Sequence, residues 1–330
     1  MEEMMKIFVY GLTQDEIQYF KQCEQRYPIV FGYCNEKATL ENAHLCAGYE
    51  AISILSTPTD AALIEAFYKQ GVRFISTRTI GYEHIDLQKC KQLNMHVGNA
   101  TYGSESVADY TIMMMLMMLR KMKLVMRSYE IQDYGFDQVL GQNITNKTIG
   151  IIGTGNIGET IIKHLQGFGC EILAYSKNQK ASLKGLCKYV SLDELYQKSD
   201  IISLHLRLCD DTYHFINDES IQKMKDGVMI VNTARGGLID NKALIKALDT
   251  HKISAAALDV CEQEAGIYYN NHKGEVLPSH DIKILNGYMN VLMLPHLAFL
   301  TDDARKDMVY HSVESCYCYY KNLNNPWQII

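Results

Sequence analysis

The sequence predicts an α/β protein built from two doubly wound parallel-sheet domains, and three observations support this. Short apolar runs rich in β-branched residues alternate with helical patterns along most of the chain, as is typical of parallel strands covered by helices. The length of 330 residues is too great for one ordinary core and suits about two domains. One strand–helix–strand pattern, residues 147–176, carries glycines at a fixed spacing.

The first hundred residues have the pattern of one small α/β domain. Apolar runs predict strands at residues 7–10, 29–33, 52–55, 74–76 and 95–97. Helical patterns lie between them at residues 15–25, 60–70 and 86–93. Each of these helices begins with an aspartate that could cap it.

Residues 104–127 form the longest helical pattern. Its stretch 112–119 has no polar face, so the sequence predicts a helix buried on most sides, either between domains or across a dimer. An apolar run of this length is too short for a membrane span, which needs about 20 residues. The density of methionine would also suit an adaptable partner surface.

A second α/β domain is expected from about residue 102 to residue 298. Its strands are predicted at residues 149–152, 172–175, 201–205, 228–231, 255–258 and 291–294, with a helix around residues 244–248. A helical stripe at residues 301–323 follows, and its pattern does not fix where it docks.

The glycines Gly153, Gly155 and Gly158 stand at G-x-G-x-x-G spacing between the first of these strands and a helix. In this context the first glycine permits a tight turn, the second lets a pyrophosphate approach the backbone, and the third packs helix on strand. The free N–H groups at the helix start would bind the pyrophosphate. The alternative is a glycine-rich turn without a ligand.

Composition narrows the class of protein. The formal net charge of −6 argues against a nucleic-acid binder, which usually has a basic surface. The start MEEMMKIFVYG has no signal-like segment, so a cytoplasmic protein is expected. Ten cysteines without C-x-x-C pairs suggest reduced thiols rather than a metal site.

Three late strands run directly into ionisable residues. Arg235 follows VMIVNTA, Asp259 and Glu264 follow AAAL, and His296 follows NVLMLP. Each alone could belong to an ordinary surface turn or solvated loop. Ligands of doubly wound sheets bind beyond the carboxyl ends of the strands. Their joint placement at the edge that carries the glycine turn therefore indicates a catalytic site.

The chemistry that fits is hydride transfer between a nicotinamide and a 2-keto acid. A histidine can supply the proton that the carbonyl oxygen needs near neutral pH. An arginine fork can bind the substrate carboxylate through two hydrogen bonds. A carboxylate behind the histidine would favour imidazolium and hold the ring. Glu264 is the candidate for that role, with Asp259 as a second.

Over nearly its whole length the sequence resembles the D-specific 2-hydroxyacid dehydrogenases. The matching segments are GIIGTGNIG, SLHLRLCDDTYHFIN, VNTARGGLID, AALDVCEQE and LPHLAF. Within the family it is similar to D-lactate dehydrogenases, particularly the vancomycin-resistance type, through GVRFISTRTIG, SVADYTIMMMLMMLRKMKLVMRS and GFGCEILAYSK. The resemblance implies that Arg235, Glu264 and His296 are catalytic.

The resemblance also implies a flavodoxin-like substrate domain, residues 1–101 plus 299–330, and a Rossmann-like dinucleotide domain, residues 102–298. It implies a homodimer through residues 104–127 and closure of the two domains over a small 2-keto or 2-hydroxy acid. Amides of Ile80 and Gly81 would bind the substrate carboxylate, while Tyr102 and Phe299 would bound its side chain or be ordinary packing aromatics. The implied contacts of NAD or NADP are Gly153, Thr154, Gly155, Asn156, Ile157, Gly158, Ser176, Lys177, His205, Thr233, Ala234 and Asp259.

Three positions depart from the family pattern. Ser176 stands where NAD-dependent relatives usually carry aspartate, and Lys177 and Lys180 follow it. These residues predict appreciable use of NADPH, unless both lysines are simply solvated. Arg207 replaces a proline and could reach a cofactor phosphate. Residues 102–104 read Tyr-Gly-Ser instead of Tyr-Ser-Pro, which suggests a less rigid helix start.

The expected activity is NAD(P)H-dependent reduction of pyruvate to D-lactate, because two bulky aromatics beside the carbonyl suit a small substrate. A branched-chain acid such as 2-oxoisocaproate is the alternative, which the long loop 266–285 could accommodate. An alternative of another class is a nucleotide-sensing binding protein without turnover.

Overall fold

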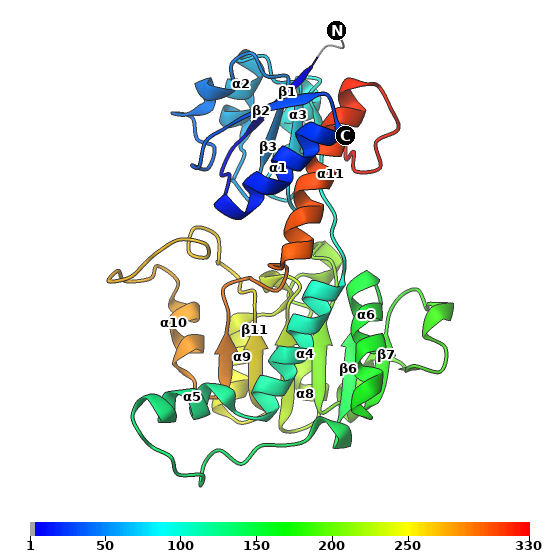
Figure 1. Ribbon diagram of the computed structural model, residues 1–330. Coiled ribbons are helices and arrows are strands. Elements are labelled where there is room, and N and C mark those ends of the chain that lie inside the picture. Colours follow the sequence, from blue (N-terminus) through cyan, green and yellow to red (C-terminus); the bar gives the residue numbers. More distant parts are fainter. Residues whose placement is uncertain (1–3) are drawn as a thin grey trace. The chain divides into compact units, whose positions relative to one another are not determined.

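The computed structural model describes residues 4–330, which form two compact units (Figure 1). Unit 1 comprises the chain up to Gly103 together with Leu300–Ile330, and unit 2 comprises Ser104–Phe299. The boundaries expected from the sequence, after residues 101 and 298, lie slightly earlier in the chain. Both units are α/β, as the sequence predicts.

Unit 1 is built on a five-stranded parallel sheet of order β2-β1-β3-β4-β5, which is the flavodoxin-like order. The strands are β1 (Met5–Val9), β2 (Ile29–Tyr33), β3 (Ala51–Ile54), β4 (Phe74–Thr77) and β5 (His96–Gly98). β3 and β4 are buried along their whole length, since helices cover both faces of the sheet.

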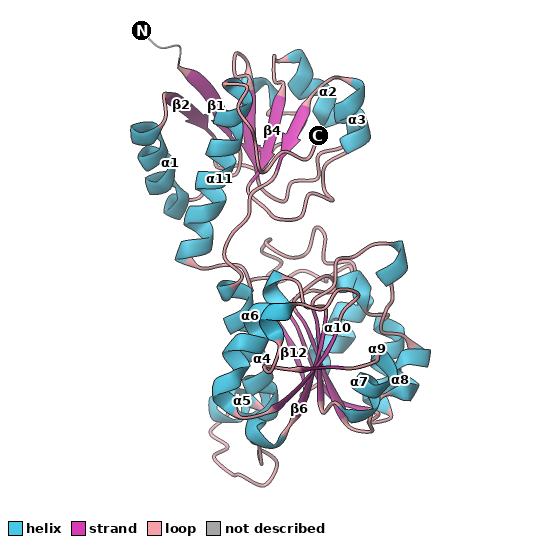
Figure 2. Cartoon of the chain, turned by 90° about the vertical axis from the view of Figure 1, so that its right-hand side faces the viewer, coloured by secondary structure: helices cyan, strands magenta, loops and turns pink. Residues whose placement is uncertain are grey.

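Two helices lie on each face of this sheet (Figures 1 and 2). They are α1 (Gln14–Arg26) and α11 (Asp302–Tyr320) on one face, and α2 (Ala61–Lys69) and α3 (Leu87–Gln92) on the other. Asp60 and Asp86 cap α2 and α3, as predicted. The predicted aspartate cap of α1 is wrong: α1 begins after Thr13, whose amide and hydroxyl both donate to Glu16, and Asp15 lies in the first turn.

The helix α11 docks on unit 1, which the sequence pattern left open. Its buried side chains Val309, Val313 and Cys316 share a hydrophobic cluster with residues of β1 and α1. Ser312 on the same helix bonds Ser53 of β3 and Ser76 of β4 at 2.8 and 2.9 Å. One face of this sheet is therefore covered by a helix that is far from the strands in sequence.

A buried ion network lies at the carboxyl ends of the unit 1 strands. The Arg78 guanidinium is fully buried, and its Nε lies 3.0 Å from Oε1 of Glu16, which is also fully buried. Arg78 also donates to the Ser53 hydroxyl at 2.9 Å and to the Tyr10 carbonyl at 3.0 Å. Arg305 of α11 reaches the same Glu16 oxygen at 3.3 Å. The network thus joins β1, β3, β4, α1 and α11.

Unit 2 is built on a seven-stranded parallel sheet of order β12-β11-β10-β9-β6-β7-β8. The strands are β6 (Thr148–Ile152), β7 (Glu171–Tyr175), β8 (Lys188–Tyr189), β9 (Ile201–Leu204), β10 (Val228–Asn232), β11 (Ile253–Leu258) and β12 (Val291–Met293). The chain builds β7 and β8 on one side of β6 and β9 to β12 on the other. The carboxyl end of β6 is therefore the topological switch point, where this fold binds ligands.

Helices cover both faces of this sheet as well (Figure 2). On one face lie α4 (Glu105–Leu119) and α6 (Asn156–Leu165); on the other lie α7 (Leu192–Lys198), α8 (Asp218–Lys223), α9 (Asn241–Asp249) and α10 (His280–Gly287). Ile149 and Ile151 of β6 face the first group, and Ile152 faces the second. This alternation follows from the pleat of the strand.

The single helix predicted for residues 104–127 is wrong. The chain breaks at Lys121, which has a left-handed φ of +50°, and a second helix, α5 (Met122–Glu130), follows with no buried residue. The Lys123 ammonium donates to the carbonyls of Asn286, Tyr288 and Val291, and these contacts direct α5 toward the end of α10. Across residues 4–330, no helix is both long and apolar enough to cross a bilayer.

Candidate active site

The glycine turn joins β6 to α6. Gly153 has φ +97°, and a Cβ there would stand 2.5 Å from the His205 carbonyl oxygen. A Cβ on Gly158 would stand 2.0 Å from the Gly153 carbonyl oxygen, so helix and turn pack at backbone distance. A Cβ on Gly155 would meet open space. The first bond within α6 runs from Glu159 N to Gly155 O, which leaves the preceding amides for a phosphate.

The neighbouring strand ends carry more of the predicted cofactor residues. Thr154 is buried, and its hydroxyl accepts a hydrogen bond from the Tyr189 hydroxyl at 3.0 Å. At the end of β9, the ring of His205 bonds Ser203 at 2.8 Å, and burial lowers the pKa of His205 to about 3, so its ring is neutral near pH 7. After β10, Thr233 bonds Thr111 of α4 at 2.8 Å. These groups surround the switch point, and they fit a dinucleotide.

Arg235 stands in a turn that Asn232 holds together. The Asn232 side chain accepts from Ala234 N at 3.0 Å and donates to the Arg235 carbonyl at 2.9 Å. The next residue, Gly236, lies against the backbone after β11, where its Cβ would be 2.1 Å from the Cys261 carbonyl carbon. Sequence reasoning missed Asn232, although asparagine next to a strand end is a turn signal.

His296 and Glu264 are in direct contact. Nδ1 of His296 lies 2.6 Å from Oε1 of Glu264. The other Glu264 oxygen accepts the Cys261 amide at 2.8 Å, which fixes the carboxylate. Both side chains are 24% exposed, so a reactant can reach the imidazole. With Nδ1 engaged, Nε2 is the nitrogen available for proton exchange.

The Asp259 carboxylate binds backbone amides and not the His296 ring, for which the sequence offered it as a second candidate. It is fully buried, and its two oxygens accept the amides of Leu297 and Ala298, each at 2.9 Å. Burial raises the pKa of its carboxyl group. The His296 amide donates to the Asp259 carbonyl at 2.7 Å, and His296 has a left-handed φ of +58°. Asp259 therefore shapes the loop that presents His296.

Two aromatic rings flank the imidazole. The Phe299 ring stands nearly perpendicular to it, with centroids 6.4 Å apart. The Tyr269 ring lies 6.0 Å away, and its hydroxyl donates to the His296 carbonyl at 2.8 Å. Sequence reasoning missed Tyr269, because it lies in a loop without periodicity. The hydroxyl supports the left-handed peptide of His296.

The other substrate candidates belong to unit 1. In the loop after β4, two backbone carbonyls accept hydrogen bonds from side chains. The Thr79 hydroxyl donates to Gly81 O at 2.6 Å, and the Asn99 amide donates to Ile80 O at 2.9 Å. Among residues 4–330, neither the Ile80 amide nor the Gly81 amide donates to a backbone carbonyl. Tyr102 is half-buried. Two such amides side by side suit a carboxylate.

The residues behind the NADPH expectation are arranged unfavourably for it. Ser176 is half-buried just beyond β7. The Lys177 side chain is 83% exposed, with Asp211 at 3.6 Å, while the Lys180 ammonium lies 2.6 Å from Glu159. Arg207 is exposed, and its carbonyl accepts the Thr212 hydroxyl. Lys180 is thus engaged within the protein.

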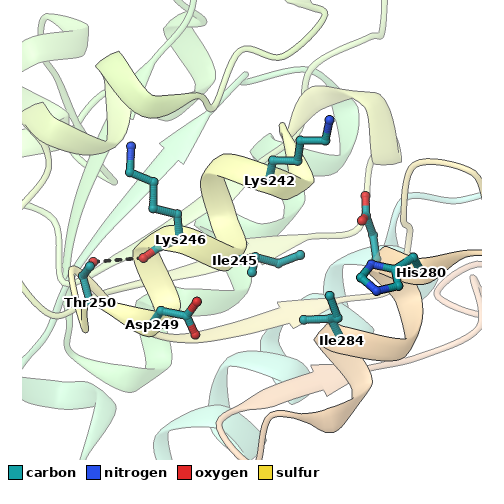
Figure 3. Close-up of a pocket in the computed structure, with 8 residues that line it drawn as sticks. Lys242, Ile245, Lys246, Asp249, Thr250, His280 and Ile284 are labelled. Atoms are coloured by element: carbon teal, nitrogen blue, oxygen red, sulfur yellow. Dashed lines mark hydrogen bonds between the residues drawn. The ribbon is translucent and has the colours of Figure 1, made fainter.

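A separate open hollow of about 390 Å³ lies between α9 and α10 (Figure 3). Its lining includes Lys242, Ile245, Lys246, His280 and Ile284. Lys246 pairs with Asp218 at 2.8 Å and accepts the Thr250 hydroxyl at its carbonyl. None of the predicted site residues lines this hollow.

The chain is similar to several known proteins. Residues 112–298 match the family model of the D-isomer specific 2-hydroxyacid dehydrogenase, NAD binding domain. A D-specific alpha-keto acid dehydrogenase of Enterococcus faecium is 37% identical, covering 94% of this chain and 95% of the relative. An aromatic 2-oxoacid reductase of Clostridium sporogenes is 38% identical, covering 92% and 93%. The structure of a pyruvate reductase of Chlamydomonas reinhardtii superposes with a TM-score of 0.92 at 30% identity, covering 98% of each chain.

The family model spans more than half of the chain, and the relatives align over nearly all of it. The chain therefore belongs to the D-isomer-specific 2-hydroxyacid dehydrogenases and is an NAD-dependent oxidoreductase that acts on the CH–OH group of 2-hydroxy acids.

Proposed function

We propose that this enzyme reduces pyruvate to D-lactate, reversibly and with NADH as the hydride donor. The observation that carries the proposal is the Glu264–His296 pair, held at 2.6 Å on the sheet edge that also bears Arg235 and the glycine turn. When bound, a nicotinamide would supply a hydride to the carbonyl carbon. The protein must then bind the carboxylate and deliver a proton to the carbonyl oxygen.

In the proposed mechanism His296 donates that proton through Nε2, because its Nδ1 is bound to Glu264. Glu264 holds the ring and stabilises its protonated form. Arg235 binds the substrate carboxylate and carbonyl oxygen with its planar fork. The amides of Ile80 and Gly81, in unit 1, are further proposed ligands of a carboxylate. The residues that would hold the dinucleotide are those of the glycine turn, with Thr154, His205, Thr233 and Ala234 around it.

The candidate substrates differ in the size of the side chain on the keto acid. Tyr102 and Phe299 favour a small side chain, and one similar structure is that of a pyruvate reductase. Branched-chain acids remain the alternative, and the similar Clostridium sporogenes reductase adds aromatic acids. An assay of NADH oxidation at 340 nm with pyruvate, 2-oxoisocaproate and phenylpyruvate separates these cases. We expect the highest kcat/KM with pyruvate; a higher value with either larger acid would contradict the pocket argument, and no turnover would favour a sensing protein.

We also propose that the enzyme is a homodimer. Its interface consists of α4, α5 and the arm that follows them, residues 131–143. Met113, Leu116, Met117 and Met122 line an open apolar hollow on these helices. In the arm, Ile131, Tyr134, Phe136 and Leu140 are each 70–81% exposed, a patch that is unusual on a monomer. A second copy of the same chain is the occupant that the family resemblance implies.

The dimer predicts a molar mass of twice the chain mass of 37.6 kDa in light scattering after size exclusion. The double variant Phe136→Asp/Leu140→Asp places two charges in the patch, and we expect it to elute as a monomer. Val276→Asp is the control, because Val276 is 86% exposed in a different loop and should leave the mass unchanged. A wild-type mass of one chain would refute the dimer.

A further inference from the structure

Strand β7 ends without the carboxylate that would select NAD(H). A carboxylate at that position normally bonds the adenosine ribose and repels the 2′-phosphate of NADP(H). Here Ser176 takes its place, and two lysines follow in the next four residues. From the sequence alone, both lysines are available to a 2′-phosphate.

Glu159, in the first turn of α6, holds one of those lysines. Its carboxylate lies 2.6 Å from Lys180 Nζ, 2.7 Å from Lys163 Nζ and 2.9 Å from the Ser182 hydroxyl. Hydrogen bonds from Lys163, Lys180 and Ser182 lower the pKa of Glu159 to about 2, so it is ionised throughout the working range. The Glu159 side chain is only 16% exposed, and that of Lys180 is 33% exposed.

The backbone around Lys180 is fixed against the glycine turn. The Lys180 amide donates to the Tyr189 hydroxyl at 3.1 Å, and that hydroxyl donates to Thr154 at 3.0 Å. Thr154 in turn donates to the Asn178 carbonyl at 3.5 Å. The loop 177–180 is thus tied to the turn that would bind the pyrophosphate. Lys180 stands near the ribose end of the site, but its ammonium is directed to Glu159.

We propose that Glu159 sets the preference for NAD(H) by sequestering Lys180, whose ammonium would otherwise be available to a 2′-phosphate. The inference rests on the proposed function of the glycine turn as the dinucleotide site. Lys177 alone does not replace Lys180, because it is 83% exposed and has Asp211 at 3.6 Å. A 2′-phosphate would meet a neutralised lysine and a solvated one.

The test measures dissociation constants of NADH and NADPH by nucleotide fluorescence, together with kcat/KM for each. Glu159→Gln removes the charge at nearly constant shape and frees Lys180. We expect NADPH affinity relative to NADH to rise about tenfold, the size of one charge-assisted contact to phosphate. Adding Lys180→Met to this variant should abolish the gain. Adding Lys163→Met should leave the gain intact, because Lys163 lies on α6, outside the loop 177–180 that is tied to the glycine turn.

The outcomes separate the two proposals. A wild-type protein that binds neither nucleotide would overturn the site itself and the proposed function with it. NADH binding retained in Glu159→Gln with an unchanged NADPH to NADH ratio would overturn the role of Glu159 alone. Should Glu159→Gln fail to fold, Lys180→Met in the wild-type background decides: an unchanged NADPH affinity supports sequestration, and a tenfold loss refutes it.

Discussion

Replacing His296 with glutamine should lower kcat for 2-keto acid reduction by about 10³-fold, within the range that general acid catalysis contributes. Glutamine keeps a polar group of similar size but cannot deliver a proton to the carbonyl oxygen. The loop should keep its shape, because Asp259 holds it through the amides of Leu297 and Ala298 rather than through the imidazole. The dissociation constant of NADH, measured by fluorescence, should stay within about threefold, since the ring is not among the groups expected to bind the nucleotide.

The control is His272→Gln. His272 lies in the same region of the chain, bonds Glu275 at 2.8 Å, and has a pKa raised by that hydrogen bond. It has no role in the proposed mechanism, so its kcat should remain near that of the wild type. A loss below about tenfold in His296→Gln would show that another group protonates the substrate.

Replacing Arg78 with methionine should lower the free energy of unfolding of unit 1 by about 3 kcal/mol, because it removes the fully buried cation that compensates the buried Glu16 carboxylate. Glu16 has no exposed side-chain surface, and Arg305 at 3.3 Å is its remaining cation. Tyr10 and Ser53 would each lose a donor as well. The measurement is denaturant unfolding followed by the fluorescence of Trp327, the one tryptophan in the sequence, which belongs to unit 1.

Two further variants test this interpretation. Arg73→Met is the matched control: Arg73 is half-buried, donates to the carbonyls of Tyr68 and Val72, and pairs with no carboxylate in the described contacts. It should cost about 1 kcal/mol. The double variant Arg78→Met/Glu16→Met removes both charges, so its loss should be smaller than the sum of the single losses. Additive losses would mean that the pair is not coupled.

Local pattern was sufficient to predict most of the fold. The buried strands of both sheets are short apolar runs, and their alternation with helices defines a parallel sheet. β8 was missed because Lys188 and Tyr189 carry no apolar run. The break at Lys121 was missed because the residues around it favour a helix, and the contacts of Lys123 lie more than 160 residues further along. Docking of α11 was likewise set by distant residues such as Ser53.

In the candidate site too, the sequence could place some residues but not their contacts. Arg235, Glu264 and His296 could be placed at strand ends from the sequence, but their roles remain predictions. Sequence reasoning put Glu264 first as the partner of His296 and kept Asp259 as a second candidate, because both follow the same strand. Their hydrogen bonds differ. The Asp259 carboxylate accepts hydrogen bonds from two backbone amides, and the Glu264 carboxylate bonds Nδ1 of the His296 ring. Glu159 gave no signal, since an acidic residue in the first turn of a helix is common.

The discontinuity of unit 1 has a consequence for synthesis. Residues 104–299 form unit 2 as one continuous segment of the chain, so we expect this unit to fold during synthesis. The five strands of unit 1 precede unit 2 in the chain, yet α11, which covers one face of their sheet together with α1, follows unit 2. Until then, Phe74 and the apolar side chains of β1 lack part of their cover. We therefore expect this sheet to expose apolar surface, and to be prone to aggregation and chaperone binding, until α11 has been synthesised.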